Sequence, residues 1–326
     1  MEAFLKDFSN QIEKARDIAE RINLPSSFIK RPAKILFCGM GGSAISGDIL
    51  GTIAQSRSRI HWTVNRNARL PEWVDSQTIV ILSSYSGNTY EVESIFKQAV
   101  ARKAHFLVVA SGGRLADEAL RKKIPLFRLP QGYPPRCAIG YGTFALLFLF
   151  IRYKWFSMSP REITEVLRIV RSFPITQAKS LARKLFQKNI HIYGGGLMQP
   201  VAMRWRTQLA ENAKTLAACE ALPEMFHHEI EGWLFPDSAI KRSVAIFLTD
   251  KNEPEWLRRK KQVAIRAIRE RGAEALEIKA RGQGGLARIF STILLGDWVS
   301  CELAKIYKID PMSVCLIDRI KKGTQR

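Results

Sequence analysis

At 326 residues, with 46% hydrophobic and 25% charged residues and no low-complexity tract, the sequence has room for two domains with buried cores, which excludes a long disordered chain. Its formal net charge of +21 attracts polyanions, but no helix-turn-helix, zinc-finger or RNA-binding aromatic signature accompanies the scattered basic residues, so a small anionic substrate is expected rather than a specific nucleic acid. Five cysteines without CxxC spacing exclude a disulfide framework and a zinc site, and they fit a reducing cytoplasm.

The first half of the sequence alternates short apolar runs with helical patterns. Residues 1–24 carry apolar side chains at three- and four-residue steps, which predicts an amphipathic helix without the features of a signal peptide. The apolar run 144–151 is too short to span a bilayer and predicts a buried helix, so no membrane partner is expected. Strands are expected at 35–38, 60–64, 78–82, 105–110 and 126–129, and helices from 43, then at 89–102, 114–122, 137–156 and 160–171.

The pattern then restarts, which indicates a duplication. Residues 35–42 resemble 190–196, each an apolar strand followed by glycines, and 78–82 resemble 243–248. Strands are expected at 189–196, 243–250 and 275–278, and helices at 176–187, 200–216, 254–271 and 285–305. Alternating strands and helices predict two α/β domains, each with a mainly parallel sheet covered on both faces. We therefore expect an N-terminal helix (1–24), a first domain (25–155) and a second domain (156–326).

The stretch "ILFCGMGGSAISGD" (35–48) places glycines where a strand enters a helix. Such a turn lets main-chain amides approach an anion at a helix N-terminus. A dinucleotide site is one interpretation, but the next strand ends without the acidic residue that would hold a ribose. Arg66 could instead suit a ribose phosphate, so a phosphorylated dinucleotide stays an alternative, as does a purely structural turn.

The stretch "SSYSGNTYE" (83–91) gathers four hydroxyl side chains at the end of an expected strand. An N-cap needs one hydroxyl, whereas a phosphate monoester needs several short donors that converge near a helix start. The pattern therefore favours a phosphate site over a dinucleotide site.

Six stretches together give a specific resemblance. They are "GMGGSAISGD", "LPEWV", "SSYSGNT", "PPRCAIGY", "AENAK" and "LPEMFHHEIEGW", in order from about residue 30. This set resembles the bifunctional phosphoglucose/phosphomannose isomerase family. The resemblance implies two flavodoxin-like αβα sandwiches, called sugar isomerase (SIS) domains, and a homodimer with a shared active site. It also implies cofactor-independent and metal-independent interconversion of glucose, mannose and fructose 6-phosphates. By this similarity the phosphate is held by Ser43, Ser84, Ser86 and Thr89, with Gly42 in the substrate pocket.

The resemblance assigns the proton transfer to Glu211 and the stabilising cation to Arg136. Aldose–ketose isomerisation moves a proton between C1 and C2 through a cis-enediol, and a partly desolvated carboxylate suits that task. Glu211 lies in "LAENAKTL" beside Asn212 and Lys214, which could orient it; the alternative is a surface ion pair. Arg136 follows a double proline and can face the charge of the enediolate.

The remaining assignments concern ring opening and the choice of epimer. His227 matches the family's ring-opening position, but His228 stands where the family usually has asparagine, so either imidazole can serve. Lys321 matches an assisting lysine, with Lys322 next to it. Val314 replaces a threonine that some members use for the mannose epimer, which weakens the expectation for mannose 6-phosphate. The rival functions are a non-catalytic sugar-phosphate regulator and, less favoured, an NADP-dependent oxidoreductase.

Overall fold

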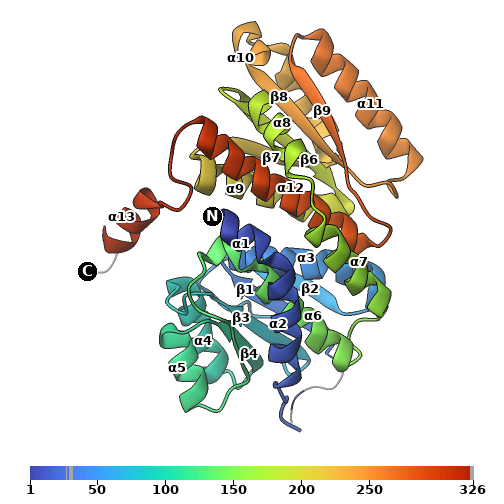
Figure 1. The fold of residues 1–326 in the computed structure, drawn as a ribbon. Helices are drawn as coiled ribbons and strands as arrows, with labels where there is room; N and C mark the ends of the chain where they lie inside the picture. The colour runs from blue at the N-terminus through green and yellow to red at the C-terminus, as the bar shows by residue number, and fades with distance from the viewer. Residues whose placement is uncertain (27, 29–31, 324–326) are drawn as a thin grey trace. The chain divides into compact units, whose positions relative to one another are not determined.

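The computed structural model describes residues 1–26, 28 and 32–323, which form two compact units. The N-terminal unit comprises residues 6–171 and 284–286, and the C-terminal unit comprises residues 1–5, 172–283 and 287–326. Each unit has a sheet between helices (Figure 1). The predicted α/β fold with two parallel sheets is confirmed.

The division between the units lies at residue 171 rather than at the expected 155. The reason is that α7 (Pro160–Arg171) packs against α2 (Phe8–Glu20), which belongs to the N-terminal unit. The helix expected at 1–24 consists of α1 (Glu2–Lys6) and α2, and α2 packs along α6 (Ile139–Arg152) instead of standing apart. Nearly all of α6 is buried, as expected for its apolar sequence.

The sheet of the N-terminal unit has the strand order β2-β1-β3-β4-β5, with parallel pairing throughout. This is the flavodoxin-like order, with a switch point between β1 and β3. Its strands are β1 (Lys34–Gly39), β2 (His61–Asn65), β3 (Thr78–Ser83), β4 (His105–Ala110) and β5 (Leu126–Arg128), and the intervening helices are α3 (Gly41–Arg57), α4 (Tyr90–Ala101) and α5 (Gly113–Arg121).

Alternation along the strands sorts the side chains onto two buried faces. Leu36 and Val80 pack with α4 and α5 on one face. On the other face Phe37 lies under α3, which also packs against α6.

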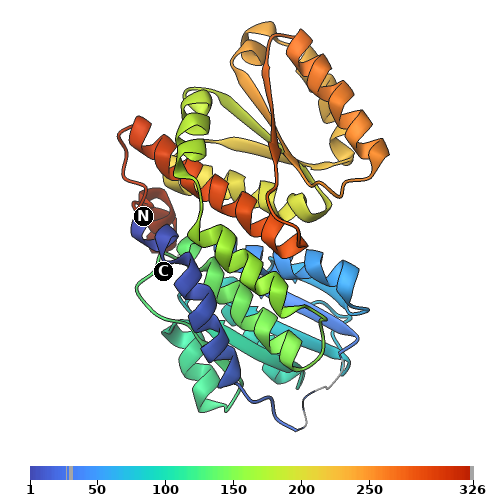
Figure 2. The same ribbon diagram turned by 45° about the vertical axis from the view of Figure 1, so that its right-hand side comes forward.

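The sheet of the C-terminal unit has the order β7-β6-β8-β9, again parallel. Tyr193 and Phe247 share one core cluster with α11, which lies along one face of this sheet (orange in Figure 2). Ala202 of α9 approaches Gly194 on the opposite face. The elements are β6 (Asn189–Gly195), β7 (Ala217–Leu222), β8 (Ser243–Thr249), β9 (Glu274–Lys279), α8 (Ile175–Leu185), α9 (Gln199–Ala213), α10 (Asp237–Lys241), α11 (Glu255–Glu270) and α12 (Gly285–Ile306).

Among the described helices and strands, β7, α10 and α13 (Cys315–Gly323) were not expected from the sequence. β7 is the edge strand of the C-terminal sheet, and its sequence AACEAL lacks the β-branched and aromatic residues that mark strands. α13 has no buried residue, so its sequence lacks the core-facing apolar pattern from which a helix is predicted. In the described part of the chain, no helix is both long and apolar enough to cross a membrane.

Helix α3 depends on two glycines for its approach to the sheet. A Cβ at Gly47 would lie 2.4 Å from the Phe37 ring, and a Cβ at Gly51 would lie 2.3 Å from the Trp62 ring. Because α3 begins at Gly41, in the glycine turn after β1, the close packing of α3 on the sheet also helps to position that turn.

We predict that Gly51→Ala destabilises the protein by about 1–3 kcal/mol, because overpacking exceeds the roughly 1 kcal/mol that alanine gains in a helix. Denaturant unfolding measures the difference. Gly232→Ala is the control, since nothing lies within 4 Å of its added Cβ. Equal stabilities of the two variants would contradict the prediction.

Candidate active site

The sheet order brings two loops of the N-terminal unit together. β1 and β3 are neighbours, and their last residues, Gly39 and Ser83, pair in register. The glycine turn after β1 and the hydroxyl loop after β3 therefore begin side by side at the carboxyl edge of the sheet. Open α/β sheets bind ligands at such a switch point.

Hydrogen bonds hold the hydroxyl loop, defined as residues 84–89, in a tight turn. The hydroxyls of Ser84 and Thr89 lie 2.8 Å apart, and the Gly87 N–H donates to Ser84 Oγ at 3.1 Å. The Tyr85 N–H donates to Ser43 Oγ at 3.3 Å, which ties the loop to the first turn of α3. Ser84 is buried, whereas Ser86 is exposed and its Oγ accepts the Asn88 N–H at 3.3 Å. Ser43, Ser84 and Thr89 are thus gathered by direct bonds, with Ser86 in the same turn.

Glycine is required at the centre of this loop. Gly87 has φ +69°, and a Cβ there would lie 1.8 Å from the carbonyl oxygen of Gly112. Gly113 has φ +72° and approaches the carbonyl oxygen of Ser86 in the same way. The loops after β3 and β4 therefore pack main chain against main chain.

Arg136 lies beside the glycine turn. A Cβ at Gly42 would lie 3.1 Å from Arg136 Cα and 3.3 Å from the Pro135 carbonyl oxygen, so the turn and the 3-10 helix η1 (Pro135–Cys137) are in close contact. Arg136 itself is buried. The structure thus brings Gly42, Ser43 and Arg136 together.

Residues of α2 and its N-cap hold the Arg136 segment, although the sequence pattern did not single them out. Gln11 is fully buried, and its Nε2 donates to the Cys137 carbonyl at 2.9 Å. The Tyr133 hydroxyl donates to Asp7 Oδ2 at 2.6 Å. A signal was present, because Gln11 is a polar residue on the apolar face of its helix, between Phe8 and Ala15.

In the C-terminal unit, Glu211 occupies the last turn of α9 and is half-buried. Lys214 caps this helix in the left-handed conformation, and its Nζ donates to the main-chain carbonyls of Glu211 (2.5 Å) and Ser313 (2.6 Å). This bridge places the segment that contains half-buried Val314 next to the end of α9. Asn212, which was expected to orient Glu211, donates to Gln208 and to Ser300 of α12.

The two histidines lie in the middle of the irregular turn after β7, residues 224–234. His227 ends the 3-10 helix η3 (Glu224–His227), and His228 precedes η4 (Glu229–Leu234). Both side chains are exposed, and His228 Nε2 lies 3.7 Å from Glu224 Oε1. Lys321 is exposed on α13, where Lys322 follows it.

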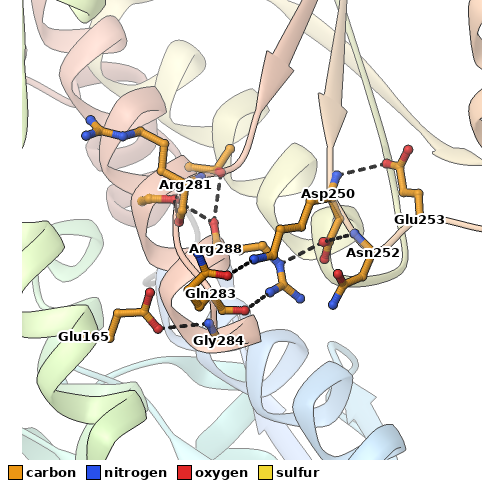
Figure 3. A network of polar contacts seen from close by, with 11 residues as sticks. Glu165, Asp250, Asn252, Glu253, Arg281, Gln283, Gly284 and Arg288 are labelled. Atoms are coloured by element: carbon orange, nitrogen blue, oxygen red, sulfur yellow. Dashed lines mark hydrogen bonds and ion pairs between the residues drawn. The ribbon is translucent and has the colours of Figure 1, made fainter.

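The corresponding switch point of the C-terminal sheet, between β6 and β8, has a different chemistry. The loop after β8 carries Asp250, whose carboxylate lies 2.8 Å from Arg288 Nε, and both side chains are buried (Figure 3). Glu253 accepts the Asp250 N–H at 3.1 Å and the Nζ of fully buried Lys261 at 2.6 Å. These carboxylates are charge-paired with cations of the same unit, so this loop gathers ion pairs where the loop after β3 gathers hydroxyls.

The alternative of a phosphorylated dinucleotide loses support from the place of Arg66. Its guanidinium forms an ion pair with Asp48 of α3. Among the described residues, no group of three or more His, Cys, Asp or Glu side chains could hold a metal ion.

Comparisons with known proteins agree with the architecture. Residues 175–323 match the model of the bacterial phospho-glucose isomerase C-terminal SIS domain. A bifunctional phosphoglucose/phosphomannose isomerase from Caldicellulosiruptor bescii is 33% identical over 95% of both chains. One from Aquifex aeolicus is 31% identical over 90% of both. The solved structure of glucosamine-6-phosphate deaminase from Thermotoga maritima covers 94% of this chain and 96% of that chain with a TM-score of 0.68, at 17% identity.

We predict that Gly87→Ala destabilises the hydroxyl loop more than Gly132→Ala does. Both positions have positive φ, but nothing lies within 4 Å of a Cβ at Gly132. Alanine costs about 1–2 kcal/mol at either position through the left-handed backbone, and Gly87→Ala adds a main-chain clash. Thermal unfolding of the two variants measures the difference, and a lower melting temperature for Gly132→Ala would refute the packing described here.

Proposed function

Because the chain belongs to the bifunctional phosphoglucose/phosphomannose isomerase family, it is a sugar-phosphate isomerase, and we propose that it interconverts glucose 6-phosphate and mannose 6-phosphate with fructose 6-phosphate. The observation that carries this proposal is the similarity to enzymes of that name along nearly the whole of both chains. The hydroxyl loop at the switch point of the N-terminal sheet supports it, since such a loop suits a phosphate monoester.

The substrate's phosphate is bound by Ser43, Ser86 and Thr89, with Ser84 as the buried member that shapes the loop. Support comes from the bonds that gather three of these hydroxyls and from the exposure of Ser86. Gly42 lies in the substrate pocket, where the absence of a side chain allows the glycine turn to approach the Arg136 segment closely.

Glu211 is the base of the isomerisation. Its carboxylate takes the proton from C2 of the opened aldose, the C–H electron pair forms the C1–C2 double bond, and the aldehyde oxygen gains a proton. The C2 hydroxyl then loses its proton as the carbonyl forms at C2, and the electron pair of the double bond takes the first proton back from Glu211 at C1, which gives the ketose. One proton is thus gained at O1 and one is lost at O2. Glucose and mannose 6-phosphates share this cis-enediol because they differ only at C2, and one base serves both carbons without a metal or cofactor.

Arg136 supplies positive charge to the enediolate, because a guanidinium stays protonated while charge develops on the oxygens. His227 transfers the proton that opens the sugar ring, with His228 as the alternative, and Lys321 or Lys322 assists. Val314 lacks the hydroxyl of threonine, so turnover of mannose 6-phosphate is the weaker activity.

We further propose that the protein is a homodimer with a shared active site, acts in the cytoplasm and serves glycolysis and gluconeogenesis. One simple measurement distinguishes each rival function from an isomerase. A regulator binds hexose phosphate without converting it, and an oxidoreductase changes the absorbance of a reduced nicotinamide cofactor.

We predict formation of fructose 6-phosphate from glucose 6-phosphate in a coupled assay in chelator-treated buffer, with slower formation from mannose 6-phosphate. Glu211→Gln lowers kcat at least about 100-fold because the base is lost, and it leaves sugar-phosphate binding nearly unchanged. Glu270→Gln, an exposed carboxylate of α11, is the matched control. Retained activity of Glu211→Gln would remove its role as the base, and an inactive wild-type protein would refute the function.

We predict that Ser86→Ala combined with Thr89→Ala raises the KM for glucose 6-phosphate at least about tenfold, since each hydrogen bond to a charged group contributes about 1.5–3 kcal/mol. Steady-state kinetics and inhibition by inorganic phosphate measure the effect. Ser56→Ala, which removes a hydroxyl elsewhere in the same unit, leaves KM unchanged. A change confined to kcat would show that the loop does not bind the phosphate.

A further inference from the structure

Three consecutive side chains, beginning with the last residue of η3, differ in their exposure. His227 and His228 are exposed, whereas Glu229 is half-buried and turned toward the sheet. Glu229 Oε1 accepts a hydrogen bond from the Tyr193 hydroxyl at 2.7 Å. Tyr193 lies on the central strand β6 and is fully buried, so it offers this carboxylate a fixed partner.

The Tyr193 hydroxyl has both of its hydrogen-bonding roles assigned. It donates its hydrogen to Glu229 and accepts the Nε1–H of buried Trp233 at 3.0 Å. His191, also on β6, places Nδ1 3.6 Å from the same carboxylate oxygen, and its ring meets the Trp233 ring edge-on at 4.9 Å. The hydrogen bond from Tyr193 therefore has one direction, with Glu229 as its acceptor.

The charge state of Glu229 agrees with that role. The pKa of Glu229 lies below its usual range, mainly because of its interaction with His191. The hydrogen bond from Tyr193 also lowers this pKa, whereas partial burial raises it. Burial and the adjacent carboxylate raise the pKa of Tyr193. At neutral pH the pair is a carboxylate and a neutral phenol, which is a charge-assisted hydrogen bond.

The main chain around the two histidines is irregular, and a side-chain hydrogen bond can fix its position. Residues 224–234 form short 3-10 turns, in which few main-chain bonds fix the path. Buried Met225 and Trp233 hold the two ends of this turn in the core. Glu229 ties the middle of it to β6, immediately after the two histidines.

We propose that Glu229 is a positioning residue: through its bond to Tyr193 it fixes the turn that directs His227 and His228 toward the sugar ring. The inference rests on the proposed function for its chemical consequence. In the His227-His228-Glu229 sequence, the carboxylate of Glu229 binds to the buried sheet, whereas the two imidazoles face the substrate.

The kinetic test compares Glu229→Ala, Glu229→Gln and Tyr193→Phe. We expect Glu229→Ala and Tyr193→Phe to lower kcat for glucose 6-phosphate about 10- to 100-fold through misplacement of the imidazoles, with KM within about twofold of wild type. Glu229→Gln recovers most of the lost kcat, because its amide oxygen still accepts from Tyr193. The double variant that combines Glu229→Ala with Tyr193→Phe is no slower than the slower single variant, since both substitutions remove the same bond.

Glu231→Gln is the matched control, because it removes an exposed carboxylate two residues away in the same turn. Its kcat stays at the wild-type value. Equal kcat values for wild type and Glu229→Ala would overturn the proposal, and so would additive losses in the double variant.

A second readout does not need activity. The imidazole Cε1–H resonances of His227 and His228 should shift in Glu229→Ala and Tyr193→Phe, while those of His61 and His105 in the N-terminal unit stay in place. If the wild-type protein lacks isomerase activity, the proposed function fails and these spectra still decide the positioning role. If Glu229→Ala does not fold, Tyr193→Phe decides it, and unshifted His227 and His228 resonances refute it.

Discussion

The geometry of the proposed phosphate site depends on main chains that approach one another more closely than side chains would permit. A Cβ at Gly87 would overlap the Gly112 carbonyl, and one at Gly42 would press on the Arg136 segment. Gly39 likewise approaches the Ser83 carbonyl, where β1 and β3 end together. Because these three contacts lie at one sheet edge, the hydroxyl loop and the main chain at Arg136 come close to the glycine turn only when glycine occupies these positions.

The two units share the turn after their first strand but differ in the side chains of a neighbouring loop. Gly41 and Gly196 follow equivalent strands and have φ of +50° and +52°, so the turn geometry is shared. The loops after β3 and β8 differ, because the first gathers hydroxyls and the second gathers carboxylates that Arg288 and Lys261 neutralise. The two switch points therefore differ in the side chains that they gather. In the proposed function, the N-terminal unit binds the phosphate and the C-terminal unit contributes acid–base groups from α9 and the turn after β7.

The sequence predicted the repeated strands and the hydroxyl loop because both are local patterns, an apolar run and a cluster of one side-chain type. It did not predict β7, whose alanines carry no strand signal, or α13, which covers no core. It could name Ser84 and Thr89 but not their mutual bond, and it could name Asn212 but not its contact with Ser300 of α12. Contacts between residues far apart in sequence depend on the tertiary fold, which no local spacing encodes.

Three irregular segments that carry candidate residues receive side-chain hydrogen bonds from regular elements. Gln11 of α2 holds the Arg136 segment, Lys214 at the end of α9 holds the Val314 segment, and Tyr193 of β6 holds the turn after His228. One such bond contributes about 1 kcal/mol to folding, which is small beside the two buried cores. Its loss can therefore displace a segment while the sheet and helices stay folded. Activity in this fold should consequently be more sensitive than stability to changes at these three anchors, even though none of them needs to touch the substrate.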